Sequence, residues 1–189
     1  MKRGLLILAT SLVIVISGCG NTANNGNKAS NTPTNTASSM DHSEMEHEKM
    51  TSEVPEGLKE AANLEFKVGD QAVITEEHMA GMKGATATIV GAYDTNVYAV
   101  SYTPITGGDP VTNHKWVIQQ ELKDAGDQLY VPGTEVVLNA DHMPGMKGAT
   151  ATVDTGEQTT VYMVDYTPTT GGEPIRNHKW VTGDELKAK

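Results

Sequence analysis

Methionine and histidine recur together in this sequence, at spacings typical of sites for soft metal ions. The densest group spans residues 40–50, where three Met and two His fall within eleven positions. Thioether sulfur is a soft, neutral donor and imidazole a borderline one, so the pair favours Cu(I) over Mg, Ca or Mn, which prefer oxygen. The group therefore predicts a copper site. Its predicted ligands are Met40, His42, Met45, His47 and Met50.

Acidic residues are interleaved with this group and leave two alternatives open. The acids are Asp41, Glu44, Glu46 and Glu48. Carboxylates would help to bind Cu(II), so Cu(II) is the alternative ion to the expected Cu(I). The segment could instead be an acidic, solvated linker in which Met and His are incidental. In the copper interpretation, we expect a chain without fixed structure that orders around the ion.

The same residue types return in two matching loops, at residues 78–82 and 142–146. Each loop offers one imidazole and two thioethers within five residues, with a glycine that permits a tight bend. Three such donors could hold Cu(I) at low coordination number. Alternatively, the methionines could plug the end of a small barrel, because Met is a common gap-filler. The candidate ligands are His78, Met79, Met82, His142, Met143 and Met146.

The remaining histidines lie in a duplicated Asn-His-Lys-Trp. His114 and His178 are candidate ligands if the strand that carries each one ends near a His-Met loop. Trp116 is more simply a core residue. The sequence leaves the distance between these histidines and the loops open.

The N-terminus is typical of an exported lipoprotein. Lys2 and Arg3 precede an apolar run over residues 5–16, which is too short to span a bilayer and matches a signal peptide over residues 1–18. The run ends in Ile-Ser-Gly-Cys19, which resembles the lipobox of bacterial lipoproteins. We expect cleavage before Cys19, lipidation of its thiol, and anchoring to the extracytoplasmic face of the cell membrane.

Composition excludes several classes of function. Removal of Lys2 and Arg3 with the signal, and of no acid, takes the formal charge from −10 to −12. Such a chain repels nucleic acid and attracts cations, so we expect no nucleic-acid partner. Cys19 is the single cysteine, and no arrangement of nucleophile, base and acid is recognisable. We therefore expect no enzymatic activity.

Two copies of one module follow a spacer. Residues 19–63 carry the lipidated Cys and a flexible tether rich in Asn, Thr and Ser. Residues 68–123 then match residues 132–187 without gaps at a period of 64, with 31 of 56 positions identical. The sequence predicts repeat 1 over residues 64–125 and repeat 2 over residues 126–189.

Apolar residues alternate with a period of two in each copy, which indicates β-strands. In repeat 1 we expect strands at residues 71–74, 85–89, 97–102 and 115–118, with a helical turn at 119–122 and turns at glycines that include Gly91. This pattern predicts a mostly β protein and looks like two tandem SH3-like small β-barrels. The opening Val-Gly-Asp and the loop His-Met-x-Gly-Met-Lys-Gly-Ala resemble the first strand and following loop of KOW-like SH3-like domains.

The combination of motifs resembles the YdhK/CopL-type family of bacterial surface lipoproteins. The lipobox, the spacer, the Met-Asp-His-Ser segment and the tandem His-Met-x-Gly-Met-Lys-Gly-Ala…Asn-His-Lys-Trp-Val repeats carry this resemblance over essentially the whole chain. It implies a lipid-anchored protein that binds Cu(I) outside the membrane and contributes to copper tolerance. The implied partners are the membrane and a copper-exporting ATPase, and the implied ligands are those of the tether and loops named above.

An adaptor that binds cell wall or protein is the alternative function. SH3-like modules often bind ligands through aromatic grooves, and under this interpretation tyrosines would matter instead of methionines. The tyrosines concerned are Tyr98, Tyr102, Tyr162 and Tyr166. A third and weaker interpretation is delivery of copper to a partner oxidase.

Overall fold

The computed structural model describes residues 53–189. The predicted signal peptide, Cys19 and the Met/His cluster at residues 40–50 lie outside the described residues. The described elements are β1 (Lys59–Glu60), β2 (Gln71–Ile74), β3 (Thr86–Tyr102), β4 (Val111–Ile118), η1 (Gln119–Glu121), β5 (Glu135–Val137), β6 (Thr150–Tyr166), β7 (Ile175–Thr182), η2 (Gly183–Glu185) and β8 (Leu186–Ala188).

The described part is almost entirely β, as the period-two pattern predicts. Its eight strands form one antiparallel sheet, and the only helical segments within residues 53–189 are the 3₁₀ turns η1 and η2. Strand β2 has the predicted bounds, and η1 lies in the predicted helical turn. Within these residues no helix is long and apolar enough to cross a membrane.

The largest difference from prediction is the length of β3. Two separate strands were expected with a turn at Gly91, but β3 runs without interruption for 17 residues. Gly91 instead lies next to a register shift, where Val90 has no directly paired partner in β6. A bulge of this kind bends a strand without ending it. The equivalent shift in β6 falls at Asp154, 64 positions later, so both long strands bend at matching places.

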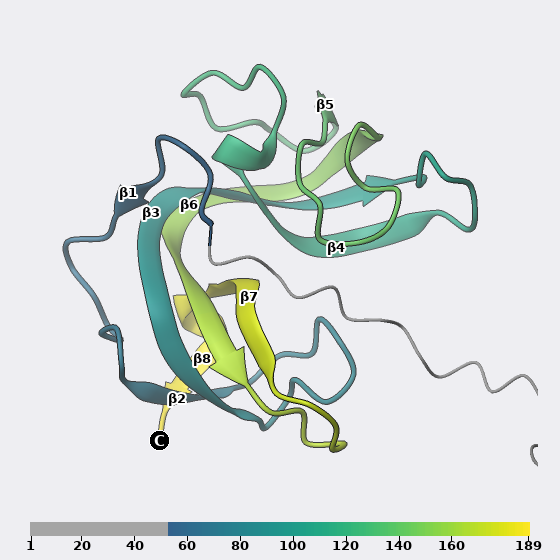
Figure 1. Ribbon diagram of the computed structural model, residues 1–189. Coiled ribbons are helices and arrows are strands. Elements are labelled where there is room, and N and C mark those ends of the chain that lie inside the picture. The colour runs from purple at the N-terminus through teal and green to yellow at the C-terminus, as the bar shows by residue number, and fades with distance from the viewer. Residues whose placement is uncertain (1–52) are drawn as a thin grey trace, which may run out of the picture. The chain divides into compact units, whose positions relative to one another are not determined.

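The two long strands pair with each other in a reciprocal register. Ala87 of β3 lies opposite Tyr166 of β6, and Tyr102 of β3 lies opposite Ala151 of β6. Because Tyr166 and Ala151 are the equivalents of Tyr102 and Ala87, the pairing maps onto itself when the repeats are exchanged. Figure 1 shows β3 and β6 side by side, with β2, β7 and β8 gathered at one end and β4 and β5 at the other. This is the geometry of a two-fold symmetric dimer interface, here within one chain.

Each hydrophobic core is shared between the repeats as a consequence. The first core combines the early strands of repeat 1 with the late strands of repeat 2, for example Ile74 and Ile89 with Tyr162 and Val164. The second core combines the late strands of repeat 1 with the early strands of repeat 2. Tyr98 and Val100 pack there among residues that include Leu138, Met146 and Val153. Neither core is completed by one repeat alone.

A third core lies across the symmetry axis. It joins Trp116, Trp180 and the strand residues Val97 and Val161, which are again equivalents. Val54 and Leu58 pack against it, and β1 pairs with β3 at Tyr93 and Asp94. Residues 53–63, which were assigned to the tether, are therefore part of the folded unit.

The expected pair of closed SH3-like barrels differs from this arrangement. The sheet follows the open path β5-β6-β3-β2-β8, with β1 and β4 added on β3 and β7 on β6. The strands at each end come from both copies, with β2, β3, β6, β7 and β8 at one end and β3, β4, β5 and β6 at the other. Equivalent strands have equivalent sequences, so pairing between repeats satisfies the same apolar pattern as pairing within a repeat.

We predict that either repeat expressed alone will be unfolded as a monomer and will fold as a symmetric homodimer. The isolated repeat retains self-complementary strands but lacks half of each core. Mixing fragments 53–125 and 126–189 should give a folded one-to-one complex. Size-exclusion chromatography with light scattering, combined with circular dichroism, tests this. A folded monomer of a single repeat would contradict the shared-core description.

Candidate metal centres

All four histidines of the described part lie around the junction of β4 and β7, which contact each other. His114 and His178 come from these strands, and His78 and His142 come from the two His-Met loops. Besides burial, the other three histidines lower the pKa of His178, and His142 and His78 lower the pKa of His114. His114 and His178 therefore lie on neighbouring strands, although 64 positions separate them in the sequence.

A local distortion of β4 and β7 positions the strand histidines. Asn113 and Asn177 have φ angles of 51° and 53°, in the left-handed region that Asn tolerates better than most residues. Their backbone N–H groups donate to Ser101 Oγ (3.1 Å) and Asp165 Oδ1 (2.8 Å). The ladder shifts register directly after the histidines, so the strand bulges and the following Trp side chains point into the third core.

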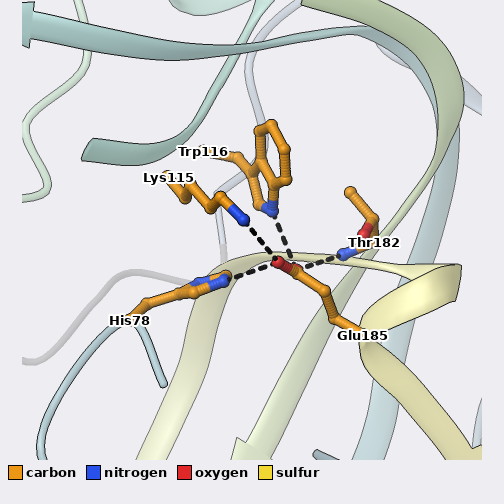
Figure 2. A network of polar contacts seen from close by, with 5 residues as sticks. All are labelled: His78, Lys115, Trp116, Thr182 and Glu185. Atoms are coloured by element: carbon orange, nitrogen blue, oxygen red, sulfur yellow. Dashed lines mark hydrogen bonds and ion pairs between the residues drawn. The ribbon is translucent and has the colours of Figure 1, made fainter. Parts of the chain in front are cut away.

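Glu185 is the hub of the polar network around His78 (Figure 2). Its carboxylate lies 2.8 Å from His78 Nε2 and accepts hydrogen bonds from Trp116 Nε1 (2.8 Å) and the Thr182 N–H (3.1 Å). Lys115 Nζ lies 3.7 Å away. Burial raises the pKa of this carboxyl, but the bonds and charge from its neighbours outweigh burial and lower the pKa to about 2. Glu185 is therefore ionised at neutral pH.

Glu121 has the same role in the other half. It lies 2.9 Å from His142 Nε2 and accepts hydrogen bonds from Trp180 Nε1 (3.0 Å) and the Ile118 N–H (3.2 Å). Burial raises the pKa of its carboxyl, while His142 and the donated bonds lower it further, so the net shift is downward. Each glutamate binds a histidine and a tryptophan of the other repeat, so the networks also join the repeats.

The carboxylates fix the tautomers of the loop histidines. An ionised carboxylate can only accept, so Nε2 of His78 must carry a hydrogen, and in the tautomer that binds a metal Nδ1 carries the lone pair. This Nδ1 is buried and has no hydrogen-bond partner among residues 53–189. A histidine oriented by a carboxylate through one nitrogen, with the other nitrogen free, is the common arrangement of a metal-binding imidazole.

The strand histidines also have buried nitrogens without partners. His178 is 3% exposed, and neither of its ring nitrogens has a hydrogen-bond partner among the described residues. Nε2 of His114 is in the same state. Burial and the neighbouring histidines lower the pKa of His178 to about 3 and that of His114 to about 4. Both rings are therefore neutral at pH 7, as metal binding requires.

One group of side chains, which we call the open centre, consists of His114, His142, Met143 and Tyr102. The rings of His114 and His142 have centroids 5.9 Å apart. The Tyr102 ring meets His114 edge-on at 6.1 Å, and its hydroxyl lies 3.9 Å from Met143 Sδ. Two imidazoles that share an ion at about 2 Å have nitrogens within about 4 Å of each other, which corresponds to ring centroids about 6 Å apart.

The residues at the equivalent positions, 64 away in the sequence, are His178, His78, Met79 and Tyr166, and we call this set the closed centre. The Tyr166 ring meets His178 edge-on with centroids 5.6 Å apart. Met79 packs against the first core, which contains Tyr166. Each centre takes its loop from one repeat and its strand residues from the other, so both depend on the exchange of strands.

The structure separates the two methionines of each loop. Met82 and Met146 are fully buried in the first and second cores, where the plug alternative places them. Met143 is 38% exposed and Met79 is half-buried. Only the first methionine of each loop is therefore accessible to an ion from solvent.

The donor set fits a soft ion of low coordination number. Within residues 53–189 no three His, Cys, Asp or Glu side chains come together in a way that could hold a metal ion. Tetrahedral Zn²⁺ sites normally use three or four such ligands. Two imidazoles and one thioether are instead a donor set suited to Cu(I).

The family model for DUF1541, described as proteins of unknown function, matches residues 68–119 and 132–183. The chain belongs to the DUF1541 family. This confirms the tandem repeat. A relative from Bacillus subtilis (strain 168), the uncharacterized protein YdhK, is 58% identical over 188 residues, covering 100% of this chain and 90% of that protein.

Solved structures of the same relative resemble the described fold. A crystal structure of the DUF1541 protein ydhK from B. subtilis is 62% identical, with a TM-score of 0.72, and covers 74% of this chain and 95% of that chain. A solution NMR structure of the ydhK C-terminal domain is 64% identical, with a TM-score of 0.63, and covers 66% of this chain and 94% of that chain.

Sequence reasoning missed the two glutamates of this DUF1541 protein. Glu121 and Glu185 occupy equivalent positions, and each is followed by Leu in both copies. The two residues that precede each glutamate differ, with Gln119-Gln120 in repeat 1 and Gly183-Asp184 in repeat 2. A single identical acid within a divergent turn was the available signal.

We predict opposite effects when His178 and His142 are each replaced by Phe. His178→Phe removes buried nitrogens without partners and should raise the free energy of unfolding of the metal-free protein by about 1–3 kcal/mol. His142→Phe leaves the buried Glu121 carboxylate without its partner and should lower the free energy of unfolding by about 3 kcal/mol. Urea unfolding at pH 7 measures both, and a loss of stability in both variants would contradict the description of His178.

We also predict that the stability of the metal-free protein falls as pH falls below about 6.5. The folded-state pKa values of His178 and His114 lie below the unfolded value, so the unfolded chain binds more protons in that range. Below about 4.5 the depressed pKa of Glu185 adds a second loss. Between pH 6.5 and 4.5 the free energy of unfolding should change less steeply with pH in His178→Phe than in the parent protein. Urea midpoints measured across this range test the prediction, and an unchanged slope would contradict it.

Proposed function

We propose that this DUF1541 protein is a lipid-anchored, extracytoplasmic Cu(I)-binding protein that sequesters copper and contributes to copper tolerance. The observation that carries the proposal is the set of buried imidazole nitrogens without partners at His78, His114 and His178, together with the short distance between the His114 and His142 rings. A buried polar atom without a partner costs free energy, and an absent ion is one physical reason for such a cost. The open and closed centres would each hold one Cu(I).

The ion would be held by neutral donors in each centre. In the open centre His114, His142 and Met143 would bind it, and in the closed centre His178, His78 and Met79 would do so. Glu121 and Glu185 would remain bound to the ring nitrogens that face away from the ion and would keep the loop histidines oriented. Thioethers do not protonate, and both strand histidines are already neutral, so binding would persist in mild acid.

The tether would supply a further site at residues 40–50, anchored to the membrane through the lipid on Cys19. The long tether with its soft ligands would capture copper near the membrane, including ions released by a copper-exporting ATPase. The chain's negative charge raises the local concentration of cations. Two SH3-like barrels are not required by this proposal, because the centres arise from the shared strands.

The burial of the tyrosines speaks against the adaptor alternative. The four residues Tyr98, Tyr102, Tyr162 and Tyr166 are at most 4% exposed. They contribute to cores and cannot line an aromatic groove for cell wall or peptide. Copper binding is therefore the function that the described geometry supports best.

We predict that Cu(I) binding by the 20–189 fragment divides into a tether part and a folded part. Replacing the tether methionines with Leu and its histidines with Ala should remove only the tether part. Adding His114→Phe and His178→Phe should remove the rest, because each centre loses a ligand without losing its fold. Titration under reducing conditions against a chromophoric chelator measures this. If the parent protein binds no more tightly than the chelator, the copper proposal is wrong.

We predict that Cys19→Ala releases the protein from the membrane. Without the thiol no lipid can be attached, and the short apolar run cannot span the bilayer. Fractionation of cells labelled with a fatty-acid analogue should show label and membrane association in the parent and neither in the variant. A parent protein that carries no label would contradict the lipid anchor.

A further inference from the structure

The open and closed centres are equivalent in sequence position but unequal in access. Met143 of the open centre is 38% exposed, whereas Met79 of the closed centre is half-buried against the first core. The strand histidines differ in the same direction, because His178 is 3% exposed and His114 is only partly buried. An ion arriving from solvent therefore meets the thioether of the open centre first.

Contacts between loops contribute to this inequality. In the closed centre the Gly81 carbonyl accepts two hydrogen bonds from Thr169, from its N–H at 2.9 Å and from its hydroxyl at 3.2 Å. In the open centre the Gly145 carbonyl accepts one, from the N–H of Ile105 at 2.9 Å. Ile105 is the equivalent of Thr169 and is 65% exposed, so it provides no hydroxyl for the second bond. The closed-centre loop is the more firmly held.

The centres are also adjacent. His114 of the open centre lies on β4 and His178 of the closed centre lies on β7, and these two strands contact each other. Glu185, which binds His78, also accepts a hydrogen bond from Trp116, two residues along β4 from His114. The two groups of imidazoles therefore lie on neighbouring elements of the fold.

We propose that the open centre captures Cu(I) and the closed centre stores it. This inference rests on the proposed function. The Met143 sulfur would form a bond to Cu(I) as a bond to the donor molecule breaks. The ion would then pass through His142 and His114 to His78 and His178. Copper remains Cu(I) throughout and the thioether carries no proton, so the exchange needs no oxidant and no acid or base.

The test compares Met143→Leu with Met79→Leu, a matched pair of volume-conserving substitutions at equivalent positions. Both are made in the mature chain with its tether ligands replaced, so that only the centres bind. Cu(I) is supplied as its complex with the coloured chelator bathocuproine disulfonate, and transfer is followed by stopped-flow absorbance. An equilibrium titration of each protein is run in parallel.

Met143→Leu should slow Cu(I) uptake roughly tenfold, because the exposed soft ligand is lost. Met79→Leu should leave the uptake rate within about twofold and should weaken retention of the more tightly bound ion in the equilibrium titration. Equal slowing in both variants, or slowing in Met79→Leu alone, would overturn the assignment of capture to the open centre. If the unsubstituted centres take up no Cu(I) at equilibrium, this inference fails, whereas the proposed function fails only if the mature chain with its tether ligands intact also binds none.

Discussion

The reciprocal pairing of β3 with β6 is the constraint on which the rest of the structure depends. Because Ala87 pairs with Tyr166 and Tyr102 pairs with Ala151, each half of the sheet contains the start of one repeat and the end of the other. The first and second cores, the contacts of the buried glutamates and both candidate centres therefore each combine residues of the two repeats. The molecule is in effect a symmetric dimer whose two subunits share one chain. Neither a core nor a centre can exist within a single repeat.

The polar networks show how such a fold accommodates charge in its interior. Glu121 and Glu185 are buried, and each carboxylate is satisfied by a histidine, an indole N–H and a backbone N–H. Fully satisfied networks of this kind hold their members in one geometry. His178 and His114 lie beside these networks and have nitrogens that nothing satisfies within the described part. The contrast between satisfied carboxylates and unsatisfied imidazoles is the physical basis for regarding the histidines as ligands.

Much of the local structure could be predicted from residues alone. The bounds of β2, the helical turn at η1 and the mostly β character follow from period-two alternation and turn residues. The continuous β3 could not be predicted, because Gly91 reads as a turn in isolation and becomes part of a bent strand only when β6 pairs across it. The strand pair also draws residues 53–63 into the fold through β1 and the third core. Glu121 and Glu185 were missed because their partners lie in the other repeat.

The sequence by itself determined the duplicated module, its strand pattern and the choice of Met and His as donors. The tertiary structure decided which copy completes which core, and therefore which histidine meets which loop. The physical reason is the near-identity of the copies. Pairing within a repeat and pairing between repeats bury the same residue types with the same alternation, so the apolar pattern cannot distinguish them. Only the three-dimensional path of the two long strands selects the exchanged arrangement, which brings His114 to His142 and Glu185 to His78.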